Sequence, residues 1–155
     1  MTHASKPPLI VRIPTPLWLL GMIVIALLID RLLQLPALLR HEPTGLALLA
    51  VGFALSVWAA LTFRRHRAQI VPSSQTHSAL VASGPFRFSR NPMYLGALAI
   101  GVGAALIAGT WPMWLVPVLL FVLQSFVIVP FEERSMERTF GDAYREYRAR
   151  VRRWI

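Results

Sequence analysis

Residues 91–131 contain no Asp, Glu, Lys or Arg, and this long apolar run limits what the chain can fold into. A helix needs about 20 mainly apolar residues to cross a bilayer, and the run holds about twice that number. Hydrophobic residues make up 55% of the 155 residues and charged residues only 15%, whereas soluble domains carry about 25% charged residues. The sequence therefore predicts an integral membrane protein. It excludes a soluble enzyme, a disordered chain and a disulfide-built secreted module.

The apolar stretches predict an all-α membrane bundle that forms a single domain, residues 1–155. The long run is best divided at residues 109–112, because Gly-Thr-Trp-Pro is a turn-forming sequence with a Trp suited to the membrane interface. Two further stretches without charge precede the run, at residues 13–29 and 43–63. We expect four membrane-spanning helices, at residues 16–39, 44–63, 92–108 and 113–129.

The arginines are concentrated on one side of these predicted spans. The segments before the first span, between the second and third, and after the fourth are basic, whereas the opposite side offers only Arg40, next to Glu42. Loops rich in Lys and Arg stay cytoplasmic, so both termini are expected in the cytoplasm. This bias also accounts for the net charge of +9, and we expect no nucleic-acid partner. The basic residues of the first two of these segments are Lys6, Arg12, Arg64, Arg65, Arg67, Arg87 and Arg90.

The segment after the fourth span predicts an amphipathic, interfacial helix. Its large apolar residues recur every three or four positions, with Arg and Glu between them. We expect the apolar face to lie on the membrane and the arginines to face headgroups or cytosol. Gly141 predicts a break between two shorter helices. The apolar residues are Met136, Phe140, Tyr144, Tyr147, Val151 and Trp154.

Small residues in the third span predict close packing against a neighbouring helix. Ala99 and Gly103, and likewise Gly101 and Ala105, have the small-xxx-small spacing typical of membrane helix contacts. Gly101-Val102-Gly103 lies inside an apolar span and is not a dinucleotide-binding loop. The chain has no cysteine and its four histidines lack metal-ligand spacing, so no metal site is predicted.

Polar residues are costly at membrane level, so clusters of them are candidate functional sites. The first cluster is residues 80–96, in which Arg90 and Asn91 precede the third span and Pro92 begins it. The free N–H groups and the positive end of that helix suit a bound carboxylate. The alternative is an ordinary juxtamembrane loop with a helix cap.

Two acidic positions are the other candidates. Glu132 and Glu133 lie at the expected cytoplasmic edge of the fourth span, where a cationic ligand would explain them. The alternative is an acidic first turn that favours the dipole of the following helix. Asp30 and Arg31 lie within the first span. A proton-coupled role is conceivable for them, but we favour snorkelling toward the outer interface.

Residues 80–96 read LVASGPFRFSRNPMYLG. This segment resembles the signature of the isoprenylcysteine carboxyl methyltransferase family, which is grouped with the phospholipid N-methyltransferases. Glu132-Glu133, then Phe140-Gly141-x-x-Tyr144-x-x-Tyr147 and a basic end, follow in the order typical of that family. The resemblance covers residues 78–153, which are expected to form the cofactor-binding methyltransferase core.

The resemblance implies a helical membrane enzyme that binds S-adenosylmethionine at the cytoplasmic face and releases S-adenosylhomocysteine. It implies an adenosyl site lined by Leu80, Val81 and Phe86. Glu132 would bind cationic or hydroxyl groups of the cofactor, and Arg90 and Glu133 would shape the reaction centre. The residues expected to hold the amino-acid portion of the cofactor are Asn91, Pro92, Met93 and Tyr94.

The chain departs from the resembled pattern at two positions, and both concern the methyl acceptor. Asn91 stands where the isoprenylcysteine enzymes have His, a variant familiar in bacterial-type members. Ile128 stands where those enzymes have an arginine associated with the substrate, so an anionic acceptor loses its obvious partner. The acceptor is expected to be lipophilic, either a prenylcysteine-like carboxylate or a phospholipid amine. Glu133 would serve as a base only for the amine.

The expected location is the bacterial inner membrane, with membrane lipids as partners and the active site on the cytoplasmic side. A small four-span transporter or scaffold without a cofactor is the alternative function. Asp30 would then be the residue of interest, and Glu132 and Asn91 would tolerate substitution.

Overall fold

The computed structural model of the chain describes residues 9–65 and 80–155, so Lys6 and Arg67 lie outside the described residues. Within these ranges the protein is helical and has no β-strand; a single antiparallel bridge joins Ala37 to Thr110. The helices are α1 (Leu9–Arg12), α2 (Thr15–Leu33), α3 (Glu42–Arg65), the 3₁₀-helix η1 (Gly84–Arg87), α4 (Pro92–Ala108), α5 (Trp111–Leu123), the π-helix η2 (Gln124–Ile128), α6 (Val129–Phe140) and α7 (Asp142–Arg150).

Three helices are long and apolar enough to cross a membrane: Thr15–Leu33, Glu42–Arg65 and Trp111–Phe140. α4 is a shorter apolar helix of 17 residues, about 25 Å long at 1.5 Å per residue. The second and third predicted spans agree with the extents of α3 and α4. The count of four spans and the orientation of the termini stay predictions.

The first and fourth predicted spans were wrong in extent. α2 ends at Leu33 because Gln34 adopts a left-handed backbone conformation (φ 47°) and its N–H bonds to the carbonyl of Asp30. The chain then runs along the α4–α5 turn, where the Leu38 N–H donates to the carbonyl of Gly109 at 2.7 Å. At the other end of the molecule, the π-helix η2 joins α5 directly to α6. A helix therefore continues past the predicted end of the fourth span.

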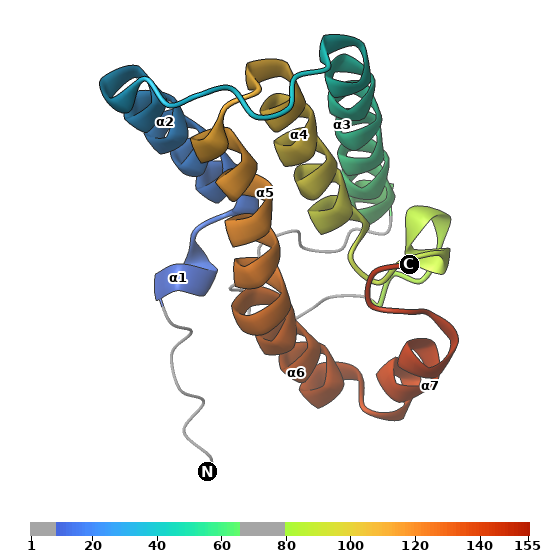
Figure 1. The fold of residues 1–155 in the computed structure, drawn as a ribbon. Helices are drawn as coiled ribbons and strands as arrows, with labels where there is room; N and C mark the ends of the chain where they lie inside the picture. Colours follow the sequence, from blue (N-terminus) through green and yellow to red (C-terminus); the bar gives the residue numbers. More distant parts are fainter. Residues whose placement is uncertain (1–8, 66–79) are drawn as a thin grey trace.

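The helices form a bundle with two different ends (Figure 1). α4 contacts α2, α3 and α5, and α2 also contacts α5. The α2–α3 connection and the α4–α5 turn lie at one end, at the top of Figure 1. η1, α6, α7 and the C-terminus lie toward the other end, together with α1. The chain segments that carry the candidate site residues are therefore gathered at one end of the bundle.

α3 and α4 pack closely because glycines face each other across their interface. A Cβ added at Gly96 would lie 2.6 Å from the carbonyl oxygen of Gly52, and one at Gly103 would lie 2.7 Å from that of Gly45. Lipid tails are as apolar as the helices, so close van der Waals packing holds such an interface together. The prediction of close packing through Gly103 is confirmed.

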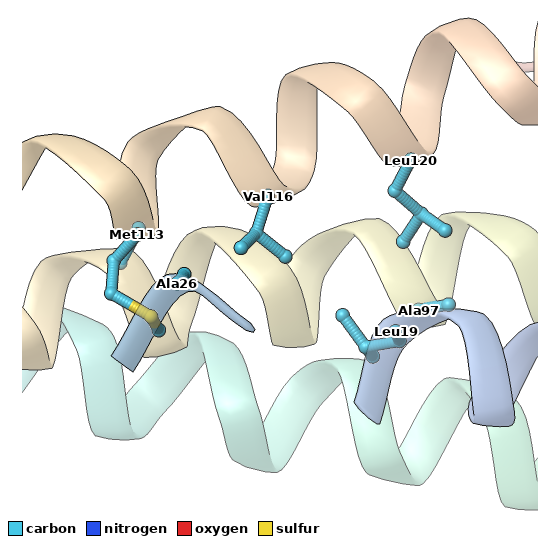
Figure 2. Packing of buried hydrophobic residues seen from close by; sticks show 7 residues of the cluster. Leu19, Ala26, Ala97, Met113, Val116 and Leu120 are labelled. Carbon is cyan, nitrogen blue, oxygen red and sulfur yellow. The ribbon is translucent and has the colours of Figure 1, made fainter. Parts of the chain in front are cut away.

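α5 holds α2 against α4 through a small apolar core. In Figure 2, side chains of α5 point toward side chains of α2 and α4. This contact fixes the first turns of α2 beside the start of α4, where the candidate site lies. The core residues are Leu19 and Ala26 of α2, Ala97 and Ala105 of α4, and Met113, Val116 and Leu120 of α5.

Candidate functional site

A cavity of about 450 Å³ lies where α2, α3, α4, α6 and α7 meet. This volume falls in the range of about 300–1,000 Å³ that is typical of small-molecule sites. The cavity is lined mainly by apolar side chains, with charged groups contributed by Arg90 and by α6. Of the residues proposed for the site, Leu80 is not in the cavity lining. Those that line the cavity are Val81, Phe86, Arg90, Asn91, Pro92, Met93, Tyr94, Glu132 and Glu133.

The loop before α4 supplies an apolar and aromatic wall. Gly84 begins η1 with a positive φ of 59°, and a Cβ there would lie 2.9 Å from the hydroxyl of Thr62 in α3. This tight turn brings Phe86 against α3, where its ring meets Phe63 edge-on with 4.8 Å between the centroids. Val81 and Phe86 are both buried. The wall of the cavity is therefore apolar and partly aromatic.

Residues near the C-terminus hold the start of α4. The Arg90 N–H donates to the carbonyl of Arg152 at 3.0 Å, and the side-chain amide of Asn91 donates to the carbonyl of Arg153 at 2.9 Å. The Ser89 hydroxyl donates to the same Arg153 carbonyl at 3.3 Å. Asn91 makes no side-chain cap of α4. Asn91 is the N-cap residue of α4 by position, and its side chain ties the loop to the C-terminal residues.

Glu132 is held by a tyrosine from the facing helix. The Tyr94 hydroxyl of α4 donates to Glu132 Oε1 at 2.6 Å. At the first residue of α6, the Val129 N–H bonds to the carbonyl of Gln124, five residues back, as in a π-helix. The wider π-turn shifts the register of the residues after it relative to α5. Both Glu132 and Glu133 then line the cavity.

Glu133 lies between two arginines. Arg153 donates two hydrogen bonds to Glu133: its Nε donates to Oε1 at 3.1 Å, and a terminal nitrogen donates to Oε2 at 2.5 Å. A terminal nitrogen of Arg90 lies 3.0 Å from Oε1. The side chains of Arg90 and Glu133 are only 9% and 11% exposed. Two guanidinium groups thus share one buried carboxylate, and the cluster keeps one unit of positive charge.

The two tyrosines of α7 face the cavity, contrary to the expectation that their helix face lies on the membrane. Tyr147 donates its hydroxyl to the carbonyl of Phe86 at 2.8 Å, and Arg90 donates to the hydroxyl of Tyr144 at 3.3 Å. Both rings are buried against the loop before α4. Burial raises the pKa of Tyr147, and burial with the charge of Glu133 raises the pKa of Tyr144. Both stay neutral hydroxyl groups near pH 7.

The predicted break at Gly141 is confirmed, with φ 52° there between α6 and α7.

Two further positions discussed from the sequence lie away from the cavity. Asp30 and Arg31 are in the last turns of α2 and do not line it. Ile128 is 1% exposed and packs with Tyr94 and Val129 in an apolar cluster. The position at which the resembled enzymes carry an arginine is therefore part of the hydrophobic core here.

Several cavity residues were missed by the sequence analysis. α3 contributes Phe53, Ser56 and Phe63, and the start of α2 contributes Thr15 and Leu19. Both helices are apolar on all sides, so no periodic pattern indicates which face meets the cavity. The pairing of Arg153 with Glu133 spans a loop and a helix and has no signal in sequence spacing. Among the described residues, no group of His, Asp or Glu side chains is arranged to hold a metal ion.

The fold and the cavity define a helical membrane protein with a charged site at one end of its bundle. The model of the family described as "Phospholipid methyltransferase" matches residues 42–143, more than half of the chain. The chain therefore belongs to the phospholipid methyltransferase family, and the resemblance found in the sequence is confirmed. The matched range includes the loop before α4, Glu132 and Glu133, but not the α7 tyrosines or Arg153.

One relative is a Haemophilus influenzae protein described as uncharacterized. It is 41% identical over 64 residues, which are 41% of this chain and 100% of that protein. No solved structure matches the chain.

Proposed function

We propose that the protein is an integral membrane methyltransferase that uses S-adenosylmethionine and methylates a lipophilic acceptor. Membership of the phospholipid methyltransferase family supports the reaction class. The observation that carries the proposal is the cavity, in which the loop before α4, the start of α4 and Glu132 and Glu133 converge. These segments are separate in sequence and carry the charges that this cofactor requires.

The cavity residues fit the chemical groups of the cofactor. S-adenosylmethionine has a carboxylate, an ammonium and a sulfonium attached to a flat adenosyl group. The surplus positive charge at Arg90 suits the carboxylate, and Glu132 suits the cationic groups. Val81 and Phe86 offer an apolar surface to the adenosyl group. We assign the adenosyl contacts to these two residues and not to Leu80, which is outside the cavity lining.

When bound, S-adenosylmethionine would supply a sulfonium-activated methyl group for attack by an acceptor nucleophile, with S-adenosylhomocysteine as the leaving group. The protein then mainly has to align the reacting atoms and exclude water. Tyr94 fixes Glu132 by the short bond to Oε1. Both oxygens of Glu133 are held by arginines, so they are not open to a substrate proton. In this arrangement Glu133 sets the position of Arg90, and the role of a base expected for it is not supported.

Apolar residues of the same cavity suit the hydrocarbon part of an acceptor. Leu19 of α2, Phe53 of α3 and Ile100 of α4 line the cavity, and α2 and α3 belong to the helices apolar enough to span a membrane. A site at the membrane edge admits a lipid from the side and a water-soluble cofactor from the aqueous phase. We propose a phospholipid amine as the acceptor, because Ile128 supplies no cation for a carboxylate. The ammonium form of this amine would have to release its proton before attack, and since arginines hold both oxygens of Glu133, the proton would pass to water at the aqueous end of the site.

The arginine distribution supports placing the charged end of the cavity at the cytoplasmic face. For a bacterial chain this membrane would be the inner membrane. The transporter or scaffold alternative receives less support, because Asp30, its residue of interest, does not line the cavity.

Calorimetric binding of S-adenosylmethionine and S-adenosylhomocysteine to the purified protein tests the proposal. We expect micromolar binding to the wild type, with affinity reduced about a hundredfold in Glu132→Gln because one buried charge is removed. Asp30→Asn is the matched control, since it also replaces a carboxylate by an amide but lies outside the cavity. Absence of binding in both detergent and lipid nanodiscs would refute the proposal. An equal loss in the two variants would refute the assignment of the site.

A further inference from the structure

The Arg90–Glu133–Arg153 cluster has more cationic than anionic groups, and its contacts are unequal. Arg153 occupies both oxygens of Glu133, whereas Arg90 reaches the carboxylate through one terminal nitrogen. The Nε of Arg90 is buried and has no hydrogen-bond partner among the described residues. Arg90 lines the cavity, and Arg153 does not. Glu133 therefore neutralises the guanidinium of Arg153, which lies outside the cavity lining. The positive charge of Arg90, inside the cavity, is only partly compensated by Glu133.

We propose that Arg153 is a positioning residue that keeps the charge of Arg90 available for a carboxylate in the cavity. This inference rests on the proposed function, since the carboxylate we assign is that of the amino-acid portion of the cofactor. By taking both oxygens of Glu133, Arg153 prevents Arg90 from pairing fully with that carboxylate. Arg153 touches neither cofactor nor acceptor in this assignment and acts only through Glu133.

The geometry makes the competition between the two arginines direct. Arg90 already lies 3.0 Å from Oε1, the same oxygen that accepts from Nε of Arg153. Without Arg153, a small rotation would let the Arg90 guanidinium bind both oxygens of Glu133. A bidentate arginine–carboxylate pair is strong, particularly where water is excluded. Arg90 would then be neutralised, and an incoming carboxylate would meet no surplus charge.

The backbone around Arg153 is fixed independently of its side chain. The Arg153 carbonyl accepts bonds from Asn91 and Ser89, and the neighbouring Trp154 packs against Phe121 with 5.5 Å between ring centroids. None of these contacts uses the guanidinium group. Replacing the side chain is therefore expected to leave the segment in place.

The test is calorimetric binding of two ligands to the full chain in lipid nanodiscs. One ligand is S-adenosylhomocysteine, and the other is its analogue without the carboxylate. Arg153→Gln should weaken the first about tenfold, the loss expected for one charge-assisted contact, and leave the second unchanged. Arg152→Gln is the matched control. It makes the same charge change at an exposed residue, and it keeps the backbone carbonyl that accepts from the Arg90 N–H.

A double variant separates positioning from a structural role. In the Arg153→Gln background, Glu133→Gln removes the competing carboxylate, so the affinity for S-adenosylhomocysteine should return toward the wild-type value. Weaker binding by the double variant than by Arg153→Gln would overturn the proposal. An equal loss for the two ligands would also overturn it, as would unchanged binding of S-adenosylhomocysteine by Arg153→Gln. Unchanged binding of S-adenosylhomocysteine by Arg153→Gln would be the result if Arg90 bound an anionic group of the acceptor and not the carboxylate of the cofactor.

The failure of this proposal is distinguishable from failure of the proposed function. A wild-type protein that binds neither ligand refutes the cofactor site itself. A wild type that binds both, with an Arg153→Gln variant that does not discriminate between them, refutes only the role of Arg153. Thermal unfolding of each variant confirms that the compared proteins are folded.

Discussion

The α3–α4 interface and the Arg90–Glu133–Arg153 cluster are held together in opposite ways. At the closest points of the interface, glycines of one helix meet backbone oxygens of the other, together with a few side chains such as Ser56 and Ile107. The cluster consists of long charged side chains from three segments that are distant in sequence. The first arrangement tolerates no added atoms, whereas the second depends on the balance of charges and can rearrange. Substitutions should therefore affect folding in the first region and ligand binding in the second.

The largest effect is expected at the helix interface. Gly96→Leu places side-chain atoms where the Gly52 carbonyl oxygen already lies 2.6 Å from a Cβ position, and neither backbone can yield without separating the helices. We expect a loss of stability of about 3 kcal/mol or more, measured by chemical unfolding in detergent. Gly21→Leu is the control, because a Cβ there meets nothing within 4 Å. Equal stability of the two variants would show that the α3–α4 contact is not tight.

A smaller effect, on ligand binding as well as on stability, is expected for Tyr94→Phe. The change removes the 2.6 Å bond that fixes Glu132 and leaves the ring in place. Affinity for S-adenosylhomocysteine should fall about tenfold, as expected for loss of a hydrogen bond to a charged group. Calorimetry gives the affinity, and chemical unfolding should show a loss of stability of about 1–3 kcal/mol, because Glu132 loses its donor. Unaltered affinity would mean that Tyr94 does not orient Glu132 for the ligand.

The smallest losses of stability are expected when the α7 tyrosines are replaced by Phe. Tyr147→Phe leaves the buried carbonyl of Phe86 without its donor at 2.8 Å and should lower stability by about 1 kcal/mol. Tyr144→Phe loses only a 3.3 Å contact with Arg90 and should cost less. Chemical unfolding of both variants measures the difference. A larger loss in Tyr144→Phe would contradict the geometry of α7.

Alkaline pH should lower the stability of the protein through Tyr147. Burial raises the pKa of Tyr147 above its ordinary value of 10.0, so the folded protein keeps the proton that the unfolded chain releases. The stability contributed by this group is present below pH 10 and is lost as the pH rises through and above 10. The unfolding temperature of the wild type should fall in that range, and that of Tyr147→Phe should fall less. Parallel curves for the two proteins would rule out this linkage.

The apolar helices were predictable because long charge-free runs leave little choice of structure. α3 and α4 have the extents expected, and Gly141 breaks the C-terminal helix as its sequence indicates. The end of α2 was missed because the residues after Leu33 remain apolar while a left-handed turn and a contact with Gly109 stop the helix. Hydropathy does not detect such a tertiary contact.

The site was predictable in its local motifs and not in its long-range pairs. The loop before α4 and Glu132-Glu133 stood out because polar groups are rare near membrane helices. The prediction that the tyrosine face of α7 lies on the membrane was wrong, since this face lines the cavity. An aromatic stripe suits a membrane surface and a protein surface equally well. The contact between Glu133 and Arg153 depends on how α7 returns the chain to the bundle.

The transfer of a labelled methyl group from S-adenosylmethionine into membrane lipid is the most direct measurement. Phospholipid vesicles containing the purified protein are incubated with the labelled cofactor, and the label in the extracted lipid is counted. We predict label in the phospholipid fraction with the wild type and a level near that of protein-free vesicles with Glu132→Gln. A folded wild type that binds the cofactor and leaves the phospholipid unlabelled would contradict a phospholipid acceptor. Equal labelling by Glu132→Gln would contradict the site.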